Sequence, residues 1–156
     1  MQSFDLADLE KKFRNKPFSC VIQAHLEKTK TKYFSILITD TIQLLPEDVQ
    51  GYSSNWISRW ESRVHDSQIY RGDCDEVLKL VTKDGKSFLQ KNGYQGKIDD
   101  KLLFYMFQLI VLSYAEKAAT DKQIRKYFIP PKTLEDYKQY IGWVAVAFVI
   151  LFLIFG

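Results

Sequence analysis

The last eighteen residues of the chain, 139–156, carry no charged side chain, and this run constrains the fold more than any other feature. Its length approaches the roughly twenty residues that a helix needs to cross a bilayer. A buried core helix is the alternative, but such a helix commonly has a polar face, and residues 144–155 have none. We therefore predict a single C-terminal transmembrane helix. Its membrane-anchoring side chains are aromatic at the headgroup level and apolar in the hydrocarbon: Tyr140, Trp143, Val144, Phe148, Leu151 and Phe155.

The sequence before this run divides into a domain and a short linker. Pro130 and Pro131 stop a preceding helix and give a stiff joint, so we expect a domain over residues 1–128, a linker over 129–138 and the anchor over 139–156. The start of the chain lacks the apolar region of a signal peptide. Basic residues precede the anchor and none follows it, which predicts a cytosolic domain. These juxtamembrane basic residues are Arg125, Lys126, Lys132 and Lys138.

The pattern within residues 1–128 favours an α+β fold. Residues 20–26 alternate in polarity and residues 33–39 are rich in β-branched and aromatic side chains, which predicts two antiparallel strands. Asp84-Gly85 lies between two apolar runs, which predicts a second hairpin with a type I′ turn. The apolar stretch 102–112 is too short to span a bilayer and predicts the start of a central core helix that ends near Lys126. We expect a small antiparallel β-hairpin domain packed on this long helix.

Helical spacing marks two further segments. Leu6, Leu9 and Phe13 predict a short amphipathic helix at the N-terminus. Trp56 and Trp60, one turn apart, belong to the apolar stripe of another helix. Tryptophan is enriched in interface hot spots, so this pair is the candidate partner-binding site, and the core face of the same helix is the alternative. The sequence leaves these two interpretations open.

Residues that carry chemistry are few. His65-Asp66 resembles a base with its orienting carboxylate, but adjacent helical residues do not reach the geometry of a nucleophilic triad. The acidic segment 73–76 lacks the spacing of a Ca²⁺ loop, and the "KDGKS" run at 83–87 lacks the upstream glycine of a phosphate-binding loop. Cys20 and Cys74 form no paired motif. We therefore predict no catalytic residue, no metal site and no cofactor, and expect that the protein is not an enzyme.

Acidic and basic residues are nearly balanced, with a net charge of +3 and no long basic block, so we expect no nucleic-acid partner. One short basic segment, "EKTKTK" at 27–32, has two interpretations. It meets anionic lipid headgroups if it faces the membrane, or it is a solvated turn.

These features favour a tail-anchored, single-pass membrane protein whose cytosolic domain is a protein-binding adaptor or assembly subunit. An accessory subunit of an integral membrane complex is the first alternative, because Gly142, Ala145 and Ala147 permit close helix approach. A membrane-bound enzyme of an unrecognised type is the second. The expected partners are the lipid bilayer and a protein whose identity and stoichiometry the sequence does not specify. The short anchor favours the endoplasmic reticulum over the mitochondrial outer membrane, or the inner membrane of a bacterium if the source is prokaryotic.

Overall fold

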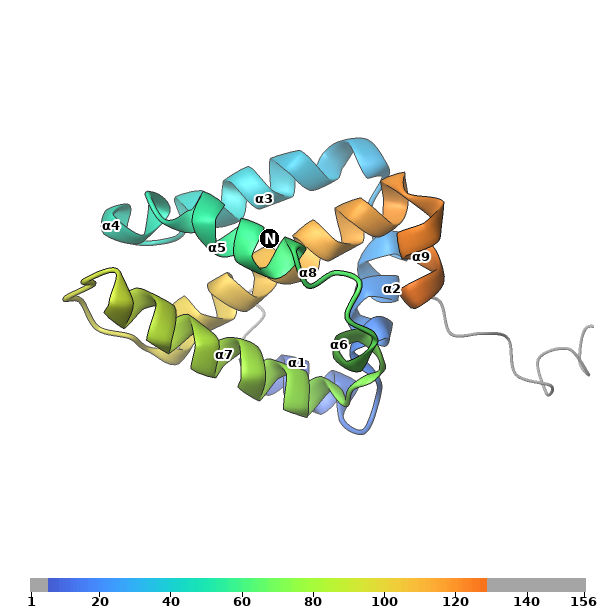
Figure 1. The fold of residues 1–156 in the computed structure, drawn as a ribbon, viewed down its shortest axis with the longest axis horizontal. Helices are drawn as coiled ribbons and strands as arrows, with labels where there is room; N and C mark the ends of the chain where they lie inside the picture. The colour runs from blue at the N-terminus through green and yellow to red at the C-terminus, as the bar shows by residue number, and fades with distance from the viewer. Residues whose placement is uncertain (1–5, 129–156) are drawn as a thin grey trace, which may run out of the picture.

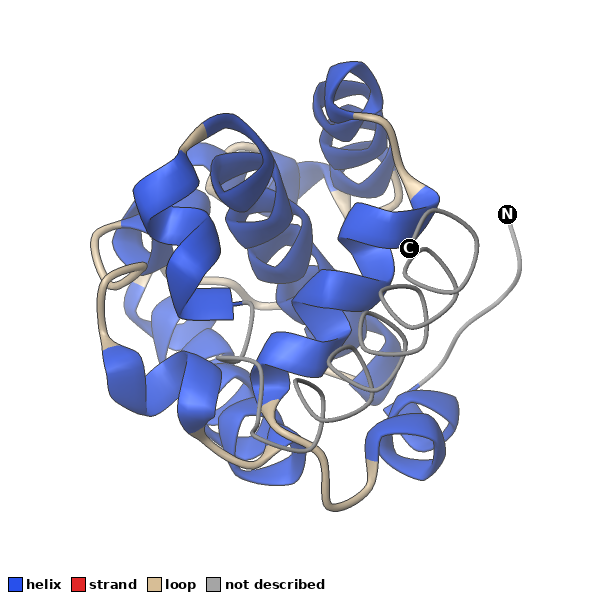
Figure 2. Ribbon diagram, turned by 90° about the vertical axis from the view of Figure 1, so that its right-hand side faces the viewer, coloured by secondary structure: helices blue, strands red, loops and turns tan. Residues whose placement is uncertain are grey.

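The computed structural model describes residues 6–128, and this part of the chain is built from helices (Figures 1 and 2). Within it, β pairing is limited to an isolated bridge between Pro17 and Asp73. The elements are α1 (Leu6–Phe13), α2 (Phe18–Lys28), the 3₁₀ helix η1 (Thr31–Tyr33), α3 (Phe34–Gln43), α4 (Glu47–Gln50), α5 (Ser53–Glu61), α6 (Ser67–Arg71), α7 (Cys74–Lys91), α8 (Asp100–Thr120) and α9 (Lys122–Phe128). The β-hairpin domain expected from the sequence is therefore wrong, whereas the short N-terminal helix and the helix that carries the tryptophans are present.

Helix α8 forms the centre of this arrangement. It begins where the Asp99 carboxylate accepts a hydrogen bond from the backbone N–H of Leu102 at 2.9 Å, which satisfies one of the free donors of the first turn. Buried residues lie on every side of α8, and α2, α3, α5, α7 and α9 all pack against it (Figure 1). The expected central helix is thus present, but it ends at Thr120, and α9 is a separate short helix after Asp121.

Among residues 6–128, α8 is the one helix that is long and apolar enough to cross a membrane. In the fold, 72% of its most apolar stretch is buried against the surrounding helices. Its composition is that of a core helix enclosed by protein. The predicted anchor, residues 139–156, and the linker before it lie outside the described residues.

The two segments predicted as strands form α2 and α3. The alternation in residues 20–26 coexists with a helical spacing, because Phe18, Val21 and Ile22 are all fully buried on one face of α2. In α3, Phe34 and Thr41 turn inward against α8, and the Thr41 hydroxyl donates to the Leu37 carbonyl at 2.8 Å. Packing against α8 outweighs the weak strand preference of the β-branched residues.

The predicted type I′ turn at Asp84-Gly85 is also wrong, because both residues lie in the middle of α7. Gly85 is buried where α7 meets α8. A side chain there would have Leu103 Cδ2 and Met106 Cε of α8 at 3.5 Å, which is ordinary van der Waals contact. A methyl group therefore fits at residue 85, and the neighbouring Asp84 pairs with α5.

Helix α7 ends at Lys91, and Gly93 follows its C-cap residue Asn92. Gly93 has a φ of +79°, its N–H donates to the Gln90 carbonyl at 3.1 Å, and the N–H of Tyr94 donates to the Leu89 carbonyl at 3.0 Å. These two bonds are the Schellman arrangement that satisfies the last carbonyls of a helix. Tyr94 then packs against the core, which fixes the direction of the loop toward α8.

The two glycines give a matched test of the helical α7. The substitution Gly85→Ala is expected to stabilise the fold by about 0.5–1 kcal/mol, because alanine is the better helix former and its methyl group fits beside α8. The substitution Gly93→Ala is expected to destabilise it by roughly 1–2 kcal/mol, because the left-handed backbone disfavours a side chain. Urea unfolding of the two variants measures both changes. A destabilised Gly85→Ala variant together with an unaffected Gly93→Ala variant would place the turn at residue 85 and contradict the fold.

Candidate functional site

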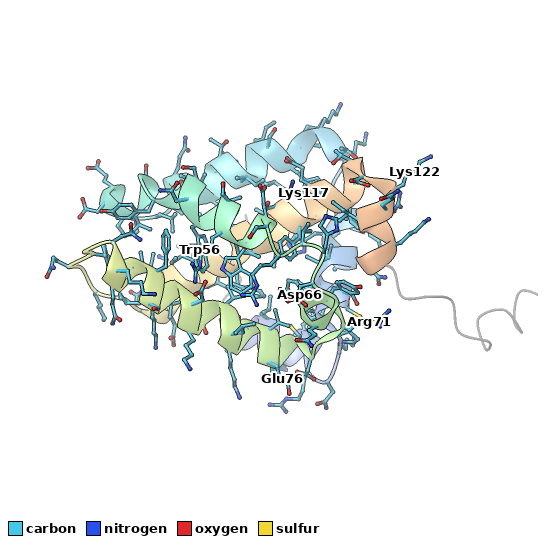
Figure 3. The ribbon with its side chains drawn as sticks, in the orientation of Figure 1. Trp56, Asp66, Arg71, Glu76, Lys117 and Lys122 are labelled. Carbon is cyan, nitrogen blue, oxygen red and sulfur yellow. The ribbon has the colours of Figure 1, made fainter. Side chains whose placement is uncertain are left out.

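The tryptophan pair lies in the core of the described fold. Trp56 and Trp60 are 1% and 0% exposed, and their rings meet edge to face with centroids 6.0 Å apart. The Trp56 indole N–H donates to the Met106 carbonyl of α8 at 3.0 Å (Figure 3), and the Tyr114 hydroxyl donates to the Trp60 carbonyl at 2.6 Å. Of the two interpretations left open by the sequence, this arrangement is the core one, because neither ring is accessible to a partner.

An ion pair links α5 to α7 beside the two tryptophans. The Arg59 guanidinium donates two hydrogen bonds to the Asp84 carboxylate, at 2.7 and 2.9 Å, and these bonds are the main reason that the pKa of Asp84 is lowered. The Arg63 guanidinium lies 4.7 Å from the Trp60 ring centroid, which adds a cation–π contact. These contacts connect α5 to α7 and the turn after α5 to Trp60.

The two histidines have different surroundings. His25 on α2 is partly buried, with Nδ1 at 2.9 Å from the Val21 carbonyl and Nε2 at 3.2 Å from the Gln108 amide nitrogen of α8. A carbonyl only accepts, so Nδ1 carries the proton, and the Gln108 amide donates to Nε2. His65 is exposed, and the neighbouring Asp66 caps α6 by accepting from the Gln68 N–H at 3.0 Å. His25 is thus a neutral structural link between α2 and α8.

The acidic segment 73–76 marks the start of a helix. Asp73 precedes α7, and its carboxylate accepts from the Asp75 N–H at 2.8 Å, as a helix N-cap does. Residues 6–128 contain no group of three metal-ligating side chains that could hold an ion. Cys20 and Cys74 are not joined by a disulfide bond in this part of the chain.

The predicted juxtamembrane residues fall partly within the described region. Arg125 and Lys126 are exposed on α9. Lys132, Lys138 and the predicted anchor side chains from Tyr140 to Phe155 lie outside the described residues.

The most distinctive surface of the described region is on η1 and α3. Four large hydrophobic residues are exposed in this region, and three of them follow one side of this segment: Tyr33 at 45%, Ile36 at 52% and Leu44 at 46%. Their neighbours toward solvent are polar, and the opposite side of α3 packs against α8. We call Tyr33, Ile36 and Leu44 the α3 face. The sequence analysis missed it because a strand over residues 33–39 places these side chains differently, whereas a helical spacing aligns them.

Comparisons of the chain with protein-family models, curated proteins and solved structures found no match.

The His25 link makes stability depend on pH. Burial lowers the pKa of His25 below its ordinary value of about 6.5, so the unfolded chain binds a proton more readily than the folded one. The contribution of His25 is fully present above pH 6.5 and is lost as the pH falls through the lowered pKa. We expect the free energy of unfolding of a His25→Gln variant to fall less steeply between pH 7.5 and 5 than that of the wild type. Urea titrations at several pH values measure this.

A His65→Gln variant is the matched control, because His65 is exposed and should leave most of the slope in place. Equal slopes for the wild type and His25→Gln would show that His25 is protonated alike in the folded and unfolded chain.

Proposed function

We propose that this chain is a tail-anchored membrane protein whose helical domain binds a protein partner through the α3 face. The observation that carries the proposal is the alignment of Tyr33, Ile36 and Leu44 on one exposed side of η1 and α3. A buried core accounts for the tryptophans and for α8, but it does not account for this stripe.

The surroundings of the α3 face resemble those of a small interface. Interfaces commonly have an apolar centre with polar groups around it, and the exposed neighbours Ser35, Thr39 and Gln43 supply such groups. Asp40 lies between Ile36 and Leu44, one helical turn from each, so a partner would also meet this carboxylate. Tyr33 adds a hydroxyl and a large ring, a side-chain type that is enriched in hot spots. The stripe is narrow and spans one helix, which suits an amphipathic helix or a flat apolar patch of the partner.

The membrane part of the proposal rests on residues 139–156. Eighteen helical residues rise about 27 Å, slightly less than the roughly 30 Å hydrocarbon core of an average bilayer, which favours a thin membrane such as that of the endoplasmic reticulum. The basic residues on the domain side of this segment favour a cytosolic domain. In this proposal, the tail keeps the α3 face of the domain at one membrane.

A second candidate is an accessory subunit of an integral membrane complex. Gly142, Ala145 and Ala147 are small residues in the first half of the anchor, and they favour close packing against a neighbouring helix. In this role the tail itself contributes to the contact with the partner.

The α3 face is tested with matched surface variants of the full chain. Ile36→Ser is expected to remove one or more proteins that co-purify with the wild type after chemical crosslinking in membranes, because it removes the most exposed apolar residue of the stripe. Leu80→Ser on α7 changes another exposed apolar residue, at 42% against 52% for Ile36, that lies away from the stripe, and it should retain them. Both changes should alter stability by less than about 0.5 kcal/mol. A partner that is retained by Ile36→Ser, or lost equally from both variants, argues against the α3 face.

The anchor is tested by extraction. The full chain is expected to stay with membranes in alkaline carbonate, because each large apolar residue of the tail gains roughly 0.3–0.6 kcal/mol on insertion. A chain that ends at Lys138 should be soluble, and protease added to sealed organelles should digest the domain of the full chain. Recovery of the full chain in the carbonate supernatant would exclude an integral anchor.

A further inference from the structure

The charges of this protein are segregated along the chain. Residues 11–32 contain seven basic residues and one acidic residue, a net charge of +6, and residues 122–126 contain three basic residues and no acidic one. Residues 33–121 contain thirteen acidic and ten basic residues, a net charge of −3. The overall charge of +3 therefore conceals two strongly basic segments.

The fold brings these two segments together. Helix α9 packs against α2, and η1 packs against α8. Helix α9 follows α8 directly in the chain and also packs against it. Figure 1 shows α9 and the connection from α2 to α3 at the same end of the molecule, and Figure 3 shows Lys122 directed outward there. We call the exposed basic residues at this place the basic end: Lys28, Lys30, Lys32, Lys122, Arg125 and Lys126.

Few acidic side chains balance the basic end. Glu27 is exposed in the same segment, and Asp121 is committed to α9, since its carboxylate accepts from the Gln123 N–H at 2.9 Å. The ion pairs found in the described residues lie elsewhere, on Arg59, Arg63 and Lys117. Lys28 of the basic end lies beside Lys12, which is outside it; the side-chain contact with Lys28 and the repulsion between the two charges lower the pKa of Lys12. An anionic surface would relieve this repulsion.

The tail limits which anionic surface is available. The end of α9 at Phe128 and the start of the anchor at residue 139 are separated by ten residues, which extend to at most about 36 Å. An inserted tail therefore keeps the basic end close to the lipid headgroups. Attraction between exposed charges is effective within about 8 Å at physiological ionic strength. A domain tethered by a linker of at most about 36 Å can approach the headgroups to this distance and dock directly.

We propose that the basic end binds the anionic headgroups of the membrane that holds the tail. This inference rests on the proposed anchor and adds an orientation to it. Helix α3 starts beside the basic end and runs away from it toward α4 (Figure 1), so docking leaves Ile36 and Leu44 of the α3 face exposed along the side of the domain, while Tyr33 lies next to Lys32.

Hydrogen exchange on the full chain in liposomes tests the orientation. The chain is reconstituted into phosphatidylcholine alone and into phosphatidylcholine with 30% phosphatidylserine, roughly the range of an anionic leaflet. Backbone amides of Lys30, Thr31 and Lys32 are expected to exchange more slowly in the anionic liposomes, and the slowing should disappear at high salt. Peptides that cover α4, at the far end, should exchange alike in both.

Two charge variants sharpen the test. The triple variant Lys30→Gln, Lys32→Gln and Lys122→Gln removes three charges of the basic end, and at about fivefold per charge it should lower the docked population by roughly a hundredfold. The control Lys79→Gln, Lys83→Gln and Lys86→Gln removes three exposed charges of α7 and should keep the slow exchange. Flotation of the liposomes reports the anchor separately.

Flotation without slowing in the anionic liposomes overturns this inference and leaves the anchor intact, whereas failure to float overturns both. Slowing by a short RNA oligonucleotide, with none by phosphatidylserine, would identify the basic end as a nucleic-acid surface and also overturn the inference. Equal loss of slowing in both triple variants would show a non-specific charge effect.

Discussion

The described structure depends on the need to cover α8 on all sides. An apolar helix with one polar face can lie at the surface of a protein, but α8 has buried residues from Leu102 to Ala118 around its whole circumference. Helices α2, α3, α5, α7 and α9 supply the cover. The order of the other helices follows from this requirement, since each contributes one apolar stripe to the same central element.

Polar groups of α8 show why it is a core helix although its length and apolarity fit a membrane span. Gln108 pairs with His25, and the Ser113 hydroxyl donates to the Glu61 carboxylate at 2.7 Å. The Met106 carbonyl accepts the indole N–H of Trp56. These three groups have their partners on α2 and α5, which hydrocarbon could not provide. The segment after Trp143 contains no such side chains, and this difference separates the two apolar runs by chemistry.

Helices were predicted correctly where the apolar spacing fits only the helical period. Leu6, Leu9 and Phe13 recur at helical intervals, and the stretch from Leu102 onward is too dense and long for a strand, so α1 and α8 were predictable. The predicted strands were wrong because short runs such as residues 33–39 fit both the strand period and the helix period. Contact with α8 favours the helix. The turn predicted at Asp84-Gly85 was wrong because this dipeptide can also lie inside a helix. Here Asp84 pairs with Arg59, and Gly85 lies against α8. The burial of Trp56 could not be predicted, since it depends on a carbonyl fifty residues away in sequence.

The incorrect strand prediction over residues 33–39 also concealed the α3 face. A helix over residues 34–43 has an inward and an outward side, and the outward side gathers apolar residues that a strand would distribute differently. The basic end was hidden in another way, because the nearly balanced composition averages two basic segments with an acidic middle. Both surfaces arise where chain segments meet at α8: α3 covers its side, while α9 and the connection from α2 to α3 lie at its C-terminal end. The basic end and the α3 face meet at η1, where the Lys32 Nζ lies 5.1 Å from the Tyr33 ring centroid, whereas Ile36 and Leu44 lie farther along the chain. The proposed membrane contact and the proposed protein contact therefore adjoin at η1, and Ile36 and Leu44 are the residues that can meet a partner while the basic end is docked.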